Sequence, residues 1–381
     1  MKPQKKKIIL IVNDKLFIVQ HLLPIIEKLK KKAKLYIVCS NKKKLKLNIV
    51  GVKFINSPIK RNPSPFDIFS LLHLAAIKLF LNPDISLSFT PKAGFINSIT
   101  FFFQGENIHY FTGQRWVNFR GFKLKAYKFI DKFIVKCSSR IYCDSNSQAK
   151  FISDNLKVKK PKVIGKGSIS GVNIERFKLI NKRLEDNVNS NNLLSENLKK
   201  VIKNNKKENT IFGFIGRLHE DKGIIELIKA FKMHLKDFPN SYLIFIGPNE
   251  LESTIFNQLK SLENSFYIDF TKRVNTILPL LSCLVLPSHR EGFGSVIIEA
   301  AASKVPIICS DIIGPRDFIK HMHNGLLFKP KSIYALKNAL DFACENKNTL
   351  KSFSQVAYKL CKKHYSEENV TMNFVNEILG I

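Results

Sequence analysis

The sequence lacks any stretch that could span a membrane as a helix. A transmembrane helix needs roughly 18 uninterrupted apolar residues. The longest apolar stretches, such as FINSITFFF at 95–103, are shorter and are followed by polar residues. The opening MKPQKKKIILIVND joins a charged cluster to an apolar run that is too short for a signal peptide. We therefore expect a cytoplasmic protein.

The sequence also lacks paired cysteines. Its seven cysteines are scattered singly, with no CxxC pair. This spacing argues against both a disulfide framework and a zinc site. Cys143, Cys283 and Cys309 lie inside apolar runs, so we interpret them as small buried hydrophobic residues.

Acidic residues are scarce. The chain has 62 Lys and Arg against 30 Asp and Glu, a net charge of +32. Residues 1–176 carry +25 of this charge and residues 177–381 carry +7. A genome-wide excess of lysine would not concentrate the positive charge in one half of the chain. The first half is therefore expected to face an anionic partner. Anionic membrane lipid is one candidate.

Aromatic and basic residues interleave in FTGQRWVNFRGFKLKAYKFIDKF at 111–133. Such a segment could stack on nucleic acid bases or lie on a membrane as an amphipathic helix. Its context within a predicted sheet domain favours the membrane or an acceptor. We therefore expect no nucleic acid partner.

Short apolar runs alternate with longer amphipathic segments along the whole chain. Continuous runs of this kind are typical of strands buried on both faces of a parallel sheet. We predict strands in the first half near 6–12, 34–40, 52–57, 84–89, 107–112, 140–145 and 162–167. After a segment rich in Asn, Lys and Glu, we predict strands near 210–216, 241–247, 266–270, 283–288, 306–310 and 325–329. The fold class is therefore α/β, with two Rossmann-like parallel-sheet domains.

The domain boundaries follow from this alternation. We predict a first domain at 1–177, a linker or insertion at 178–209, with a weak helical pattern around 193–203, and a second domain at 210–364. A final helix at 365–381 is expected to pack back on the first domain. Two such domains place a ligand cleft near the carboxyl ends of their strands.

The first motif with chemical meaning is GFIGRLHEDKG at 213–223. A buried strand ends at Gly216, Arg217 and Lys222 follow, and an amphipathic helix begins after Gly223. Two cations beside a helix N-terminus suit an anion, and a diphosphate in particular. The alternative is a solvated loop with ordinary surface charges.

The second motif is SHREGFGSVIIEAAASKVPIICSD at 288–311. Glu291 falls in a glycine-containing turn after a buried strand, and Glu299 falls inside the following helix. Each carboxylate could accept hydrogen bonds from a sugar diol. Glu299 lies among apolar residues, where a lone carboxylate is costly without a partner. The alternative role for Glu299 is to pair with a neighbouring cation.

These motifs, together with NGLLF at 324–328, resemble the retaining glycosyltransferases of family 4, which have the GT-B fold. The spacing Glu291-x7-Glu299 is a signature of that family. SFTPKAG (88–94), IHYFTGQRW (108–116) and GKGSISGVNIERF (165–177) resemble its branch that builds capsule, O-antigen and related glycans on a polyprenyl-diphosphate carrier.

The resemblance implies a role for each matching residue. Arg217 and Lys222 would hold the donor diphosphate, Glu299 would bind the nucleotide ribose, and Glu291 would contact the transferred sugar. The implied catalytic residues are Arg217, Lys222 and Glu291. The implied donor-binding residues are Gly216, Gly292, Phe293, Gly294, Ser295 and Glu299. The donor would be a nucleotide sugar, UDP-linked by expectation, with no cofactor and no metal.

The first domain would bind the acceptor, a polyprenyl-diphosphate-linked saccharide, at the inner face of the cytoplasmic membrane. The candidate acceptor residues are Asn13, His21, Lys92, Thr112, Gly113 and Arg115. The sequence departs from the family where many relatives carry His, because Thr112 precedes Gly113 here. It also lacks the glycine-rich first loop of many relatives, and Cys283 replaces an Asp that many of them have.

Two other classes of function remain open at this point. One is a GT-B sugar-nucleotide epimerase, which uses a similar cleft without an acceptor. The other is a non-enzymatic protein that binds polyanions, which would explain the basic first half but not the pair Glu291 and Glu299.

Overall fold

The computed structural model describes residues 5–40, 47–59, 64–65, 67–100, 102–103, 105–113, 116, 119–178, 192–203 and 209–381. The chain forms two compact units. Unit 1 comprises Met1–Ser170 and Glu367–Ile381, and unit 2 comprises Gly171–Ser366. Within the described residues, no helix is long and apolar enough to cross a membrane.

Unit 1 is built on a seven-stranded sheet whose paired strands are all parallel. The strand order is β3-β2-β1-β4-β5-β6-β7. The strands are β1 (Lys7–Asp14), β2 (Lys34–Ser40), β3 (Val52–Asn56), β4 (Ile85–Ser88), β5 (Glu106–Phe111), β6 (Arg140–Cys143) and β7 (Lys162–Val163).

The two faces of this sheet carry separate apolar layers. Successive side chains of a strand point to opposite faces, so Ile8 and Leu10 of β1 enter one apolar cluster while Ile9 and Ile11 enter another. The helical elements of unit 1 are α1 (Lys15–Phe17), the π-helical turn η1 (Ile18–Leu22), α2 (Leu23–Lys32), α3 (Asp67–Leu81), α4 (Pro91–Ile99), α5 (Gly121–Cys137), α6 (Asn146–Leu156) and α17 (Glu367–Leu379).

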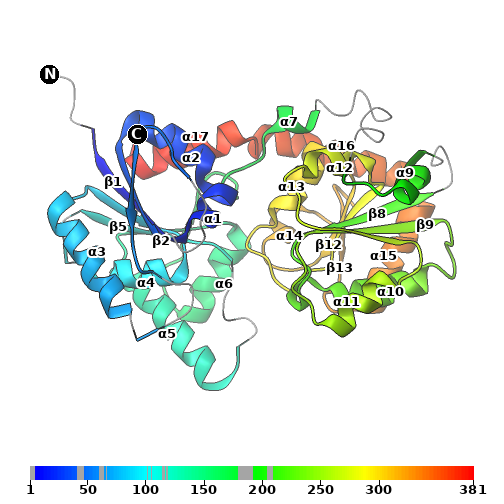
Figure 1. Ribbon diagram of the computed structural model, residues 1–381, viewed down its shortest axis with the longest axis horizontal. Helices are drawn as coiled ribbons and strands as arrows, with labels where there is room; N and C mark the ends of the chain where they lie inside the picture. The colour runs from blue at the N-terminus through cyan, green and yellow to red at the C-terminus, as the bar shows by residue number, and fades with distance from the viewer. Residues whose placement is uncertain are drawn as a thin grey trace. The chain divides into compact units, whose positions relative to one another are not determined.

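Helix α17 completes the core of unit 1 although it is the last element of the chain. It packs against α2, and Figure 1 shows it in red beside the blue helix. Phe374, Val375 and Ile378 join the same buried cluster as Ile8 and Leu10. Arg140 on β6 donates hydrogen bonds to the carbonyls of Glu377 (2.6 Å) and Ile378 (2.9 Å) at the end of this helix.

Unit 2 is built on a six-stranded parallel sheet in the order β10-β9-β8-β11-β12-β13. The strands are β8 (Thr210–Ile215), β9 (Ser241–Ile246), β10 (Ser265–Ile268), β11 (Cys283–Leu286), β12 (Ile307–Ser310) and β13 (Leu326–Phe328). The helical elements are α7 (Ile174–Lys178), α9 (Glu196–Lys203), η2 (Glu220–Lys222), α10 (Ile224–His234), α11 (Ser253–Lys260), α12 (Val274–Ile277), η3 (Leu278–Leu280), α13 (Ser295–Ala302), α14 (Pro315–Phe318), α15 (Ile333–Glu345) and α16 (Lys347–His364).

The two parallel sheets confirm the predicted α/β class with two Rossmann-like units. The boundaries differ from the expected ones in three places, one of which is that Tyr365 and Ser366 group with unit 2 and not with the final helix. Residues 171–177 group with unit 2 rather than with the first domain. Part of the expected linker also belongs to unit 2, because α9 is amphipathic and buries Leu198 in that unit's core.

Candidate active site

The predicted donor residues gather at the carboxyl edge of the sheet of unit 2. Strands β8 and β11 are parallel neighbours in this sheet, so the loops that leave their carboxyl ends lie side by side. Arg217 follows β8, and Glu291 follows β11. Ligands of open α/β sheets bind at such an edge.

Lys222 and Glu291 form an ion pair across these two loops. The Lys222 Nζ lies 2.7 Å from Glu291 Oε1, although 69 positions separate the two residues in the sequence. The buried Ser288 hydroxyl donates a second hydrogen bond, also of 2.7 Å, to the same carboxylate oxygen. Two donors therefore fix the orientation of the Glu291 side chain.

The two loops are also fastened through Asp221. The backbone N–H of His289 donates to the Asp221 carbonyl at 2.8 Å, and Arg290 pairs with the Asp221 carboxylate at 2.9 Å. Gly223 is required here, because its φ is +69° and a Cβ would come within 2.1 Å of the Pro287 carbonyl oxygen. The position of Lys222 is therefore set by backbone contacts and a partly buried ion pair.

Arg217 lies on the same edge and pairs with the carboxylate of Glu250, in the loop after β9. Both side chains are partly exposed. The two cations predicted to hold a diphosphate thus each contact a carboxylate in this structure. An incoming diphosphate would exchange these partners for its own oxygens.

The segment from Gly292 to Ser295 leads into helix α13. Gly294 is the N-cap residue with φ +86°, and no side chain caps the helix there. Phe293 is buried against the ring of Tyr365, with centroids 5.3 Å apart. The first N–H groups of a helix have no intrahelical acceptor, so this turn presents donors suited to a phosphate or sugar oxygen.

Glu299 lies about one turn further along α13 and keeps only part of its surface in contact with solvent. Burial raises the pKa of its carboxyl to about 7, and the charge of Arg176 opposes this shift. No hydrogen bond or ion pair joins its carboxylate to another residue within the described ranges. Arg176 instead donates to the Lys272 carbonyl at 2.6 Å. Arg176 is therefore a neighbouring cation that acts on Glu299 through its charge, without a hydrogen bond between the two side chains.

The predicted acceptor residues lie in unit 1, several of them at the carboxyl edge of its sheet. Thr90, after β4, donates a hydrogen bond of 2.7 Å to the Asn13 side chain at the end of β1. Thr112 and Gly113 follow the adjacent strand β5. His21 lies against the Phe17 ring, and burial lowers its pKa.

Two predicted acceptor residues stand apart from this group. Lys92 is buried at the start of α4 and pairs with Asp67 at 2.5 Å, which gives it a structural contact. Arg115 lies outside the described residues.

Sequence reasoning missed a buried carboxyl in unit 1. Asp144 directly follows β6, and burial raises its pKa to about 7 against the opposing effects of the Tyr110 hydroxyl and the Gly113 backbone N–H. It lies beside the loop of Thr112 and Gly113. Its position after the strand IYC was the available signal, because polar residues at carboxyl ends of parallel strands often face ligands.

Some conspicuous residues have structural roles instead. His109 is buried, and its Nδ1 lies 2.9 Å from the Ser88 hydroxyl. Cys143, Cys283 and Cys309 are buried, as predicted. Among the described residues, no group of three or more His, Cys, Asp or Glu is placed to hold a metal ion.

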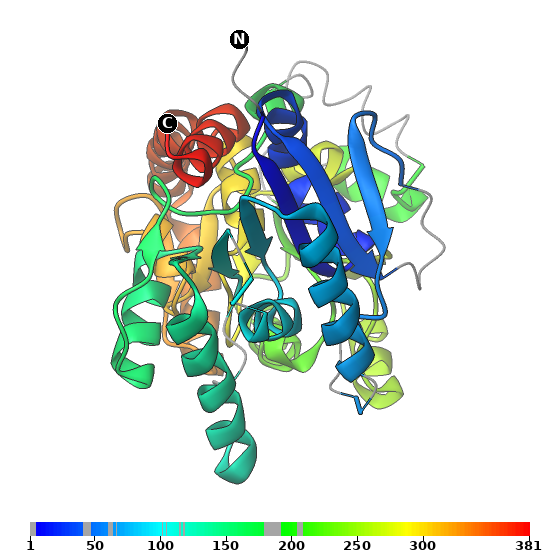
Figure 2. The ribbon, with the colours of Figure 1, turned by 90° about the vertical axis from the view of Figure 1, so that its left-hand side faces the viewer.

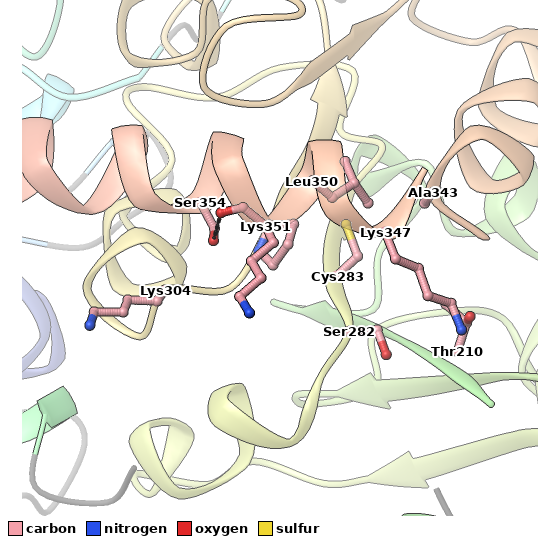
Figure 3. Close-up of a pocket in the computed structure, with 10 residues that line it drawn as sticks. Thr210, Ser282, Cys283, Lys304, Ala343, Lys347, Leu350, Lys351 and Ser354 are labelled. Carbon is pink, nitrogen blue, oxygen red and sulfur yellow. Dashed lines mark hydrogen bonds between the residues drawn. The ribbon is translucent and has the colours of Figure 1, made fainter. Parts of the chain in front are cut away.

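A separate pocket of about 210 Å³ lies at the opposite edge of the unit 2 sheet. Thr210 and Cys283, the first residues of β8 and β11, line it together with Lys304, Lys347 and Lys351 (Figure 3). The three lysines are exposed. None of the predicted donor residues lines this pocket, so it is distinct from the candidate site.

The chain is similar to known proteins in sequence and in fold. Residues 195–360 match the family described as "Glycosyl transferases group 1". The chain is 30% identical over 355 residues to the capsular polysaccharide biosynthesis glycosyltransferase CapM of Staphylococcus aureus. This match covers 89% of this chain and 88% of CapM. The chain is 26% identical over 224 residues to the UDP-Gal:alpha-D-GlcNAc-diphosphoundecaprenol alpha-1,3-galactosyltransferase of Escherichia coli, covering 56% of this chain and 54% of that enzyme.

Among solved structures, the chain is similar to HepE of Anabaena in complex with UDP and glucose. The TM-score is 0.76 at 15% identity, and the match covers 99% of this chain and 100% of HepE. At this identity the likeness shows a shared fold, and it confirms the fold expected from the sequence.

Proposed function

Because the chain belongs to the group 1 glycosyltransferases, we propose that it transfers a sugar from a UDP-linked donor to a lipid-diphosphate-linked saccharide during surface-polysaccharide biosynthesis. CapM, by its name, acts in capsular polysaccharide biosynthesis. The Escherichia coli relative, by its name, uses UDP-Gal and a diphosphoundecaprenol-linked acceptor. These names support the proposal for the donor and the acceptor.

The observation that carries the proposal is the fixed pair of Lys222 and Glu291 beside Arg217 and the uncapped start of α13. This arrangement combines cationic side chains with helix N–H donors at one sheet edge. Such groups stabilise negative charge that develops on a leaving diphosphate. We expect no metal requirement, because the cations and the helix N-terminus supply this charge stabilisation.

Each residue has a part in the proposed reaction. Arg217 and Lys222 bind the diphosphate, Glu299 accepts hydrogen bonds from the ribose hydroxyls, and Glu291 positions the transferred sugar. The bond between the anomeric carbon and the UDP oxygen breaks as the acceptor oxygen attacks from the same face. The acceptor proton passes to the leaving phosphate oxygen, and the anomeric configuration is retained.

Substitution of Arg217 tests this assignment. Arg217→Ala should reduce the rate of sugar transfer by about 100- to 1,000-fold, because the variant loses a donor to charge that develops in the transition state. Arg273→Ala, which removes another arginine of the same unit, is the control. The measurement is product formation from a UDP-sugar and a lipid-diphosphate saccharide, with the donor chosen from a thermal-shift screen of sugar nucleotides. Rates near those of the parent would refute the role of Arg217.

Incubation with the donor alone separates this function from the rival classes. Conversion of the donor to an epimer without acceptor would identify an epimerase. Binding to DNA without affinity for UDP would identify a polyanion-binding protein. Either result would overturn the proposal.

A further inference from the structure

Helix α3 turns large apolar side chains toward solvent. Five of them are between 52% and 86% exposed, and we call them the α3 apolar stripe: Ile68, Phe69, Leu72, Leu79 and Phe80. The polar residues Ser70 and Lys78 of the same helix are buried instead. A helix that faces water normally has the reverse arrangement.

The inward polar residue Lys78 has well-defined partners. Its ammonium donates to the Asn107 side chain at 2.8 Å and to the Thr100 carbonyl at 3.2 Å. The orientation of α3 is therefore fixed by hydrogen bonds on its inner side. A contiguous exposed apolar surface held in this way usually marks a site of interaction.

Helix α5 carries a second exposed row, of different chemistry. Its members follow one another at spacings of three and four residues and so lie on one side of the helix. We call this row the α5 basic stripe: Phe122, Lys125, Phe129, Lys132 and Lys136, all exposed. The only acidic residue of α5 is Asp131, which is buried and accepts a hydrogen bond of 2.7 Å from the Trp116 indole.

The two stripes belong to one side of unit 1. Helix α4 packs against both α3 and α5, and Figure 2 shows the two longer helices flanking it. Each helix follows the carboxyl end of a strand, α3 after β3 and α5 after β5, and Asn13 and Thr112 lie at the same edge of the sheet. A lipid surface at these helices would bring a lipid-linked acceptor to that edge.

We infer that the α3 apolar stripe and the α5 basic stripe form a docking surface for an anionic lipid bilayer. The lysines of α5 match anionic headgroups in charge, and the exposed side chains of α3 match the boundary between headgroups and acyl chains. A nucleic acid would satisfy the lysines but offers no apolar layer for Leu72 and Leu79. This inference deepens the proposed function and rests on its lipid-linked acceptor.

Flotation with vesicles tests the docking surface. The probe is vesicles of phosphatidylcholine with 30% phosphatidylglycerol, compared with pure phosphatidylcholine, at low and high salt. The parent chain should partition onto the anionic vesicles. Lys125→Gln/Lys132→Gln/Lys136→Gln should weaken partitioning on the order of 100-fold at low salt. Phe69→Ser/Leu72→Ser should weaken it about 10-fold or more, with the salt dependence unchanged.

Matched controls come from unit 2. Lys351→Gln/Lys359→Gln/Lys362→Gln removes three exposed lysines of α16, and Tyr334→Ser removes an exposed aromatic ring of α15. These controls should partition like the parent. Thermal melting and UDP affinity, measured for every variant, confirm that each one is folded.

The outcomes separate this inference from the proposed function. Sugar transfer without vesicle binding would overturn the docking surface alone, whereas vesicle binding without transfer would overturn the proposed function alone. Partitioning unaffected by Phe69→Ser/Leu72→Ser would refute the role of α3. Tighter binding to duplex DNA than to anionic vesicles would refute the bilayer as the occupant.

Discussion

At the scale of single residues, Glu299 links stability to pH. Its pKa is raised from 4.5 to about 7, so the folded chain binds more protons than the unfolded chain between these values. Stability should therefore fall as the pH rises from 4.5 to 7. Glu299→Gln has no carboxyl to titrate, so its stability should not fall in this way. Above pH 7 it should melt at a higher temperature than the parent, with a free energy of unfolding larger by at most ~3 kcal/mol.

If Glu299 binds the ribose as proposed, the same substitution should weaken UDP binding by about 10-fold or more, because a charged acceptor for the ribose hydroxyls is lost. Thermal melting across pH 4.5–8 and UDP titration measure the two effects. Glu263→Gln, an exposed substitution in the same unit, serves as the control. If Glu299→Gln gained no stability, or bound UDP as the parent does, its placement as an uncompensated donor-binding carboxylate would be wrong.

The residues of the candidate site were predictable to different degrees. Arg217, Lys222, Glu291 and Glu299 follow strands in recognisable motifs, and the structure gathers the first three at one sheet edge. The pairing of Arg217 with Glu250 was not predictable, because it depends on the relative position of two loops 33 residues apart. Tertiary contacts of this kind leave no local pattern in the sequence.

At the scale of elements, the positions of the strands were predictable from the sequence, but the orientation of α3 was not. Every predicted strand overlaps one in the structure, because continuous apolar runs have few other ways to be buried on both sides. The sequence of α3, DIFSLLHLAAIKLFL, is apolar nearly all round. Its pattern therefore does not reveal that Lys78 points inward and Phe80 outward.

The buried Lys78 makes the packing of α3 dependent on pH. Burial lowers its pKa from 10.5 to about 7, so the folded chain binds fewer protons than the unfolded chain between these values. Stability should therefore rise with pH across that window. Lys78→Met should remove this rise. The substitution also takes a hydrogen-bond donor from Asn107 and so changes the absolute stability. The readout is therefore the slope of the free energy of unfolding against pH.

Urea unfolding at pH 7, 8, 9 and 10 measures this slope. Lys53→Met, at an exposed position of β3, should keep the slope of the parent. A slope that survives in Lys78→Met would show that another group is responsible.

At the scale of the whole molecule, α17 makes unit 1 depend on the end of the chain. Phe374 is 1% exposed and packs with the rings of Phe89 and Tyr110. Phe374→Ala should destabilise unit 1 by ~3–5 kcal/mol and leave unit 2 unchanged. Hydrogen exchange followed by peptide analysis can resolve the units, with Phe353→Ala as the reciprocal variant in the core of unit 2. Equal loss of protection in both units of Phe374→Ala would contradict this division.

The place of α17 also has a consequence for the order of folding during synthesis. A ribosome completes residues 171–366, the whole of unit 2, before it makes the helix that fills the core of unit 1. Domains usually fold in the order in which they emerge. Here the first unit to emerge must wait with an unfilled apolar surface, around Phe89 and Tyr110, until the second has been made. The nascent chain therefore exposes that surface until residues 367–379 have been made, and an apolar surface exposed in this way is prone to aggregation.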